Sequence, residues 1–308
     1  MEWSRREVLG SIVASLGAAT IEGRQRSRPA GEPFGYCLNT STIRGNQLGI
    51  VREVEAVAKA GFHALEPWIA ELDAYTKDGG SLKDLGKRIA DAGLTVENVI
   101  AFNSLLYEDP AERAAALERL KVDMDKVAQI GGKRIAVPPG TSRGPAVSLD
   151  NAATYYRDAL ELGEKMGVQP LLELWGTHPL LGPLRNGVYA SVAAGRPDAS
   201  LLLDVFHLYK TGTPFASLAQ IAGASLHVIH MNDYPGAADP SALNDSHRVY
   251  PGDGIAPFRQ ILRDLRDTGF RGVFSLELFN RDYWTRSADE NLKTGLEKMR
   301  TVVRQALA

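Results

Sequence analysis

The chain has 308 residues, of which 44% are hydrophobic and 23% charged, and its net charge is −2. This composition is typical of a globular protein with a large core, and the near-neutral charge argues against a general nucleic-acid or membrane-surface binder. The single cysteine, Cys37, excludes an internal disulfide and a zinc site built from thiolates. The length fits either two average domains or one α/β barrel, which takes about 250 residues.

The first thirty residues differ in composition from the rest of the chain. Two adjacent arginines, Arg5 and Arg6, precede the uncharged run Val8–Ala19, and a polar, basic tract follows. This order is typical of a signal peptide, and the uncharged run is too short for a permanent membrane anchor. The arginine pair resembles a twin-arginine export signal. We therefore predict an export segment over residues 1–30, a barrel domain over residues 31–308 and a periplasmic or exported location. The alternative is a cytoplasmic protein with an amphipathic extension.

From Phe34 onward, short apolar segments alternate with amphipathic segments. The apolar segments predict strands over Phe34–Leu38, Phe62–Glu66, Leu94–Val99, Arg134–Val137, Val168–Leu174, Leu201–Val205, Leu226–His230 and Gly272–Asn280. The amphipathic segments predict helices over Gln47–Ala60, Leu82–Ala92, Pro110–Ile130, Asn151–Met166, Leu184–Ala194, Phe215–Ala222, Pro257–Thr268 and Ala288–Leu307.

Eight alternating units predict a parallel sheet closed into a single-domain (β/α)8 TIM barrel. The alternative is an open, doubly wound sheet that binds a dinucleotide. That fold requires a glycine-rich phosphate loop after its first strand, and residues 39–45 read NTSTIRG instead.

Each of the last four predicted strands carries a potential metal ligand at its end. These residues are Glu173, Asp204, His230 and Glu277. The carboxyl ends of barrel strands meet at one face, and a carboxylate in an apolar strand needs a cation or a donor beside it. The four residues therefore predict one divalent-metal site. Three carboxylates and one imidazole suit Mn²⁺, Mg²⁺ or Co²⁺ better than a structural zinc, and Zn²⁺ remains an alternative.

The ordered segments LLELW, LLLDVFH, HVIHMND and SLELFN, together with RVYPGDG, resemble the xylose-isomerase-like TIM barrels. This superfamily includes sugar isomerases, ketose 3-epimerases, inosose dehydratase-like proteins and endonuclease IV, and the resemblance extends from Phe34 to the C-terminus. It implies a metal-dependent sugar isomerase or epimerase that works through a metal-stabilised enediolate. Glu173 and Glu277 would bind the metal and also move the proton, and we expect Mn²⁺ as the cofactor. His207 would donate a hydrogen bond to a substrate oxygen, with capping of the following helix as the alternative. Arg248 would bind a substrate hydroxyl or carboxylate, with a solvated loop residue as the alternative.

Further residues are predicted to lie at the mouth of the barrel and to bind substrate. They are Glu66, Trp68 and Trp175, with Phe206, Phe279, Tyr283 and Trp284 as additional aromatic walls. Aromatic rings suit the apolar faces of a sugar, although the alternative for each aromatic residue is core packing. His178 and His227 are predicted to be structural.

Three other functions follow from the same residues. A lyase or dehydratase would use the enediolate to expel a β-leaving group from a keto-sugar or keto-glycoside. An inactive sugar-binding barrel would keep the fold without catalysis. An endonuclease IV-like enzyme would use Asp245 and His247 as further zinc ligands. That last alternative is disfavoured because the second and fourth strands end without histidine and the chain has no basic excess.

We therefore expect a small sugar or polyol as the partner, without nucleic acid or stable membrane insertion. A homo-oligomer is compatible with the sequence.

Overall fold

The computed structural model describes residues 32–140 and 147–308, so the predicted export segment lies outside the described residues. The strands are β1 Gly35–Asn39, β2 Ala64–Glu66, β3 Thr95–Val96, β4 Arg134–Val137, β5 Gln169–Glu173, β6 Leu201–Asp204, β7 Leu226–Met231 and β8 Val273–Leu276. The α-helices are α1 Ile50–Ala60, α2 Ile69–Lys77, α3 Leu82–Asp91, α4 Pro110–Gln129, α5 Leu149–Met166, α6 Leu184–Ala193, α7 Val205–Lys210, α8 Phe258–Asp267 and α9 Ala288–Leu307.

The eight strands are parallel and follow the order β3-β2-β1-β8-β7-β6-β5-β4. The residues just after β3 form hydrogen bonds with β4, so the two strands at the ends of this order are connected. The backbone N–H of Val99 donates to the carbonyl of Arg134 at 3.2 Å, and the carbonyl of Val99 accepts from the N–H of Ala136 at 2.9 Å. The predicted (β/α)8 barrel is therefore confirmed.

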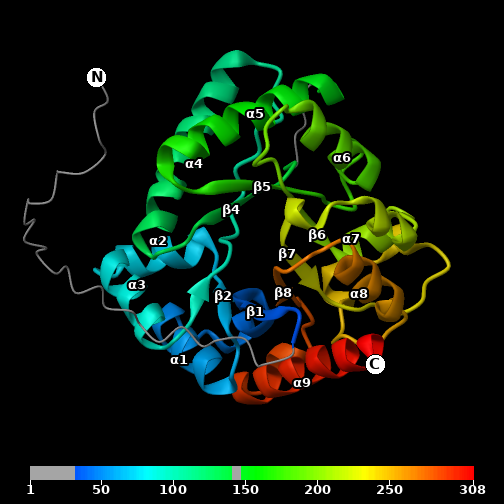
Figure 1. The fold of residues 1–308 in the computed structure, drawn as a ribbon. Helices are drawn as coiled ribbons and strands as arrows, with labels where there is room; N and C mark the ends of the chain where they lie inside the picture. Colours follow the sequence, from blue (N-terminus) through cyan, green and yellow to red (C-terminus); the bar gives the residue numbers. More distant parts are fainter. Residues whose placement is uncertain (1–31, 141–146) are drawn as a thin grey trace, which may run out of the picture.

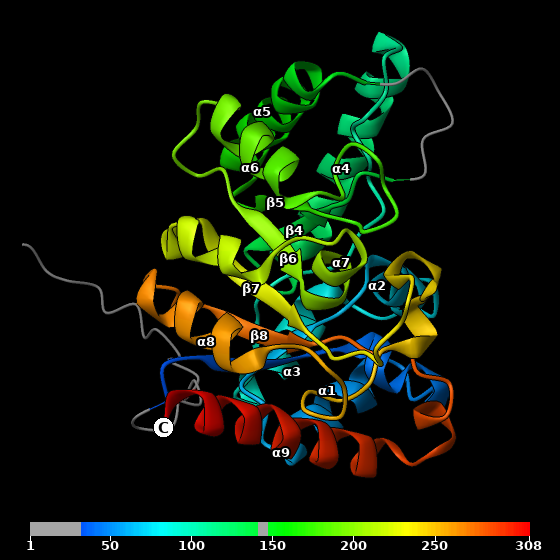
Figure 2. The same cartoon turned by 90° about the vertical axis from the view of Figure 1, so that its right-hand side faces the viewer.

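The helices surround the strands, and the last helix lies beside the first (Figure 1). Figure 2 shows α8 and α9 side by side on one flank of the barrel. Local sequence sets several helix ends: Asp109 accepts hydrogen bonds from the N–H groups of Ala111 and Glu112 at the start of α4. Gly61 ends α1 with φ of 93°, a conformation that favours glycine. None of the helices in the described residues is long and apolar enough to cross a bilayer.

The alternation of strand residues explains why the predicted ligands point inward. In β5, β6 and β7, the residue two positions before the predicted metal ligand belongs to the apolar interior of the barrel. For Glu277, which directly follows β8, the corresponding interior residue lies four positions earlier. These interior residues are Leu171, Leu202, Val228 and Val273. They fill the barrel below the site, so the predicted ligands form the next layer toward the carboxyl ends of the strands.

Several predicted boundaries were wrong. The sixth strand ends at Asp204 because the carboxylate of Asp204 accepts the N–H of His207 at 3.0 Å and begins α7. The eighth strand is shorter than Gly272–Asn280, and Glu277 directly follows β8. The helix predicted over Phe215–Ala222 is a 3-10 helix over Phe215–Gln220. Helices α2 and α7 were not predicted.

Candidate metal and active site

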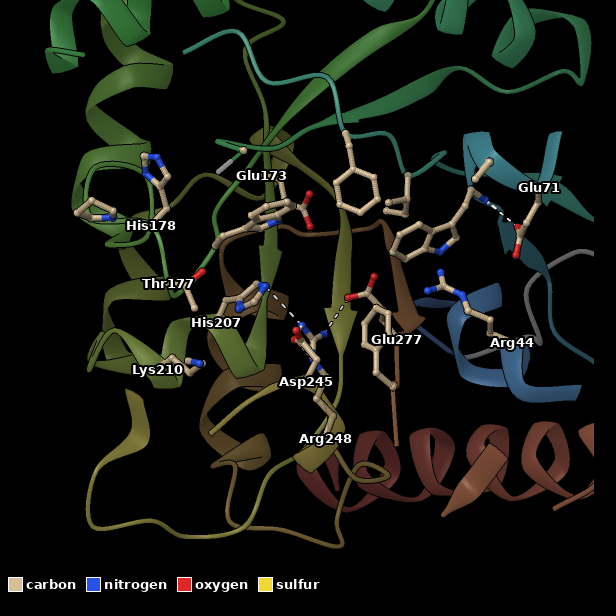
Figure 3. A pocket seen from close by; sticks show the side chains of 18 of the residues that line it. Arg44, Glu71, Glu173, Thr177, His178, His207, Lys210, Asp245, Arg248 and Glu277 are labelled. Carbon is tan, nitrogen blue, oxygen red and sulfur yellow. Dashed lines mark hydrogen bonds and ion pairs between the residues drawn. The ribbon is translucent and has the colours of Figure 1, made fainter. Parts of the chain in front are cut away.

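A cavity of about 1010 Å³ opens at the carboxyl ends of the strands. Its lining includes Glu173, His207, Arg248 and Glu277. In Figure 3, Glu277 and Arg248 lie in the middle of this cavity, Arg44 and Glu71 on one side, and His178, Thr177 and Lys210 on the other. The loops after several different strands therefore contribute to one site, as is usual for this fold.

The imidazole of His230 is fully buried between carboxylates, two of which, Glu173 and Glu277, line the cavity. Its Nδ1 is 3.1 Å from Oε2 of Glu277, 3.5 Å from Oδ2 of Asp204 and 4.0 Å from Oε1 of Glu173. This Nδ1 makes no hydrogen bond in the described structure, despite its depth. A buried ring nitrogen without a hydrogen bond, facing three carboxylates, is a suitable ligand for a cation.

The ligand atoms of Asp204, His230 and Glu277 all lie within 4.8 Å of one another, which is close enough to share one metal ion. Glu173 is slightly farther out and does not belong to this tight group. That the four residues bind one metal ion stays a prediction; the described structure brings Asp204, His230 and Glu277 together and leaves Glu173 outside this group. Two carboxylates and an imidazole suit Zn²⁺ as well as Mn²⁺.

Glu66 lies behind His230 and not at the barrel mouth, where we predicted it. Its carboxylate is fully buried, lies 3.2 Å from Nε2 of His230 and does not line the cavity. It also accepts hydrogen bonds from Asn39, Asn98 and Ser275 at 2.6–2.9 Å. A carboxylate on the second nitrogen of a metal-binding histidine commonly fixes its tautomer and orientation.

Arg248 connects the two carboxylates of the site to the loop after β7. The side chain is only 2% exposed, and its Nη1 donates to Oδ2 of Asp204 at 2.6 Å and to Oε2 of Glu277 at 2.8 Å. Its Nε and Nη2 donate to Oδ1 of Asp245 at 3.0 and 2.6 Å. Nη2 also lies 3.4 Å from Nε2 of His207. Arg248 and His207 both line the cavity, and their role in binding substrate oxygens stays a prediction.

The environment shifts the pKa values of several groups in the site, including Glu173, His207 and His230. Burial raises the pKa of Glu173 to about 8, with Glu277 adding to the shift and His230 opposing it. Burial also lowers the pKa of His207 to about 4, against the charges of nearby carboxylates. For His230 burial acts downward, but Glu277 and Glu66 outweigh it and hold the pKa well above its ordinary value.

The predicted aromatic wall is present in part. Trp68, Trp175 and Phe279 line the cavity. Phe206 is buried below Arg248, with the guanidinium 4.9 Å from the centre of its ring. Tyr283 and Trp284 do not line the cavity: Tyr283 stacks on Tyr250, and the indole of Trp284 donates to the carbonyl of Ser41.

Among the remaining histidines, His178 and His247 accept hydrogen bonds from nearby backbone N–H groups. Nδ1 of His178 accepts from the N–H groups of Leu180 and Leu181, although the residue also lines the cavity. His247 is exposed, and its Nδ1 accepts from the N–H of Asn244 at 3.0 Å. His227 lines a different cavity, which includes Gly35 and Gly272 near the amino ends of β1 and β8.

Sequence reasoning missed the amides that hold the carboxylates. Nδ2 of Asn39 donates to Glu66 at 2.9 Å and to Glu277 at 3.1 Å, and Nδ2 of Asn232 donates to Asp204 at 3.1 Å. Asn39 ends β1 and Asn232 directly follows β7. The rule that selected the four predicted ligands, a polar residue at the end of a strand, therefore also applies to both amides.

The model of the xylose isomerase-like TIM barrel family matches residues 54–302. The chain belongs to this family. Among curated relatives, it is 26% identical to an inosose isomerase of Bacillus velezensis over 87% of this chain and 96% of that protein. It is 25% identical to a 3-dehydroshikimate dehydratase of Pseudomonas putida over 80% of this chain and 39% of that protein.

One solved structure similar to this family member is a crystal structure of the IOLI protein with a bound zinc atom. It superposes with a TM-score of 0.82, at 24% identity, over 89% of this chain and 99% of that one. The similarity supports the barrel fold described above.

Proposed function

We propose that this protein is a divalent-metal-dependent isomerase or epimerase of a sugar or polyol ketone, which moves a proton next to a carbonyl group. The observation that carries the proposal is the position of His230 Nδ1, buried, without a hydrogen bond and within 4.0 Å of three carboxylates. The family membership and the similarity to an inosose isomerase support the same reaction class.

Asp204, His230 and Glu277 would hold the cation, with Glu173 as the fourth ligand. When bound, a divalent cation supplies Lewis acidity that polarises a substrate carbonyl and stabilises the negative charge that develops on its oxygen. Glu66 would hold the imidazole of His230 in place from its far side. Both Mn²⁺ and Zn²⁺ are compatible with this ligand set, and metal analysis of the purified protein would distinguish them.

Glu173 and Glu277 would act as the proton-transferring pair. Both line the cavity, and their strands β5 and β8 are separated by β6 and β7, so the carboxylates approach a substrate from different directions. One carboxylate removes the proton beside the carbonyl, and the other returns a proton to the opposite face or to the adjacent carbon. Return to the opposite face gives an epimer. Return to the former carbonyl carbon, while the proton of the neighbouring hydroxyl moves to the former carbonyl oxygen, gives an isomer. Arg248 and His207 would bind substrate oxygens.

The test is proton exchange in D₂O, followed by NMR with a panel of ketoses and inososes and with added Mn²⁺ or Zn²⁺. Deuterium incorporated next to a carbonyl by the wild type, and its loss in Glu277→Gln and Glu173→Gln, is the expected result. Wild-type exchange in both variants would remove the two carboxylates from the mechanism. Exchange that is unchanged after exhaustive chelation would refute the metal dependence.

A second candidate function is a lyase or dehydratase, which the similarity to a 3-dehydroshikimate dehydratase favours. The first step is the same proton removal, but the electron pair then expels a leaving group on the neighbouring carbon. An unsaturated product in the same NMR experiment would identify this reaction, whereas an epimer or isomer would identify the first.

A further inference from the structure

The cavity is larger than a single sugar ring requires. Its volume of about 1010 Å³ lies at the upper end of the range of roughly 300–1,000 Å³ for sites that bind drug-sized molecules. The groups proposed for chemistry, Glu173, Glu277, His207 and Arg248, line only part of it. The rest of the lining must therefore face either solvent or a further part of the ligand.

Four aromatic rings form a continuous band along the cavity lining. The ring of Phe279 lies 6.0 Å from that of Trp68, Trp68 lies 5.4 Å from Phe102, and Phe102 lies 5.9 Å from Trp175. All four residues line the cavity. The band thus begins beside Glu277, two residues from Phe279 in the chain, and ends beside Glu173, two residues from Trp175, with Trp68 and Phe102 between these ends.

Phe102 is the unusual member of the band. Its side chain is 65% exposed, although a phenylalanine is normally buried. It follows β3 in a segment whose neighbours Ala101 and Leu105 are buried, so the chain holds it at the rim of the cavity. An exposed aromatic ring at the rim of a ligand cavity is typical of a surface that a ligand covers.

Arg44 adds a polar group to the same side of the cavity. Its guanidinium lies 4.1 Å above the ring of Trp68 and 5.6 Å from that of Phe279. Its side chain is exposed, and its charge acts on the nearby carboxylates of Glu71 and Glu53. An arginine stacked on an aromatic ring keeps its N–H donors in the plane of the guanidinium, where a hydroxyl or carboxylate oxygen can reach them.

We propose that the substrate is a glycoside, in which the reacting keto-sugar is linked to a second ring. The assignment of the reacting unit to Glu173 and Glu277 rests on the proposed function. The second ring would stack on the band of Phe279, Trp68, Phe102 and Trp175, and Arg44 would donate hydrogen bonds to its oxygens. Both an aromatic aglycone and a second sugar offer the apolar ring face that such a band binds.

The test measures binding, so that it does not depend on turnover. Affinities of methyl β-glucoside, phenyl β-glucoside and methyl β-cellobioside are compared by calorimetry on the full-length protein. Ring stacking predicts that at least one two-ring ligand binds about threefold to tenfold more tightly than methyl β-glucoside. A preference for the phenyl compound indicates an aromatic aglycone, and a preference for the cellobioside indicates a second sugar.

Phe102→Ala should remove this preference and leave the affinity for methyl β-glucoside unchanged. The matched control is Tyr189→Ala, which deletes another exposed aromatic ring, 46% exposed on α6 and outside the cavity lining. It should preserve the preference. Because Phe102 is exposed, its replacement is not expected to affect folding.

Equal affinities for all three ligands, or an equal loss for all three in Phe102→Ala, would overturn the inference. No measurable binding by any of them, while the exchange assay shows turnover of a free ketose, would overturn it as well. The two proposals fail separately: a two-ring preference without proton exchange on any ketone would refute the proposed reaction and leave the glycoside site standing.

Discussion

Replacing Arg248 with methionine tests how the carboxylates of the site are neutralised. Methionine is unbranched and similar in length, so it can keep apolar contact with Phe206 and Phe279 while removing the charge. The substitution removes the positive charge beside two buried carboxylates, Asp204 and Glu277, which Nη1 contacts at 2.6 and 2.8 Å. The third partner, Asp245, has a side chain that is 53% exposed, so its ion pair contributes little.

Removing one partner of a buried ion pair costs about 3–5 kcal/mol, because the remaining charge is left uncompensated. We expect Arg248→Met to lower the free energy of unfolding of the metal-free protein by about this amount. A divalent cation bound by Asp204 and Glu277 would replace the lost positive charge. The variant should therefore gain more stability from added metal than the wild type does.

The measurement is denaturant unfolding followed by circular dichroism, in chelator and with saturating Mn²⁺ or Zn²⁺. The control is Arg196→Met, which breaks ion pairs to Glu164 and Asp198 on the surface and should change stability much less. Arg248→Lys keeps the charge without the forked geometry and should fall between the wild type and Arg248→Met. The reasoning is wrong if Arg248→Met and Arg196→Met unfold alike in chelator, or if metal stabilises the wild type and Arg248→Met equally.

Three further predictions concern other parts of the chain. Glu66→Gln weakens the contact that orients His230 and should lower metal affinity by about 10–100-fold in chelator competition; unchanged affinity would contradict that role. Burial and the charge of Glu71 raise the pKa of Glu53, which is 4% exposed, from 4.5 to about 8. The folded protein then holds a proton that the unfolded chain releases, so wild-type stability falls as pH rises through this window. Glu53→Gln should reduce the fall in the free energy of unfolding between pH 5 and 8 by up to a few kcal/mol. Parallel profiles of unfolding free energy against pH for the wild type and Glu53→Gln would contradict this prediction. Mass spectrometry of the protein from its producing cells should show a mature N-terminus near residue 31, whereas an intact Met1 would contradict export.

The strand alternation explains why much of the barrel could be predicted. Inward-facing residues are two apart in a strand, so an apolar interior residue and a polar residue two positions later, such as Leu202 and Asp204, share one face. Parallel strands bring their carboxyl ends to the same side. These two rules together were sufficient to bring Asp204, His230 and Glu277 into one group.

The depth of Glu66 could not be predicted from the same rules. It also ends a strand, and β2 pairs with β1 so that Glu66 lies opposite Asn39. Its height along the barrel axis depends on the tilt and stagger of all eight strands. No single strand contains that information. Glu66 was therefore predicted at the barrel mouth, whereas it lies behind His230.

One buried carboxylate organises the long loop after β7. Asp233 accepts hydrogen bonds from the N–H groups of Tyr234, Gly252, Gly254 and Ala256 at 2.8–3.0 Å. A side chain at Gly254 would collide with Asp233, which explains the glycine there. Three of these bonds join positions 19–23 residues apart, so local sequence patterns do not reveal them. They hold the loop that carries Arg248 into the site.

The aromatic band and the reacting carboxylates are connected through Asn39. The indole N–H of Trp68 donates to Oδ1 of Asn39 at 2.8 Å, which directs the Nδ2 of the same amide toward Glu66 and Glu277. A change at Trp68 would therefore disturb both ring stacking and the position of Glu277. Phe102 contacts the band through its ring, which has no hydrogen-bonding group that could join this amide network. Its replacement consequently separates binding of a second ring from proton transfer, which replacement of Trp68 cannot do.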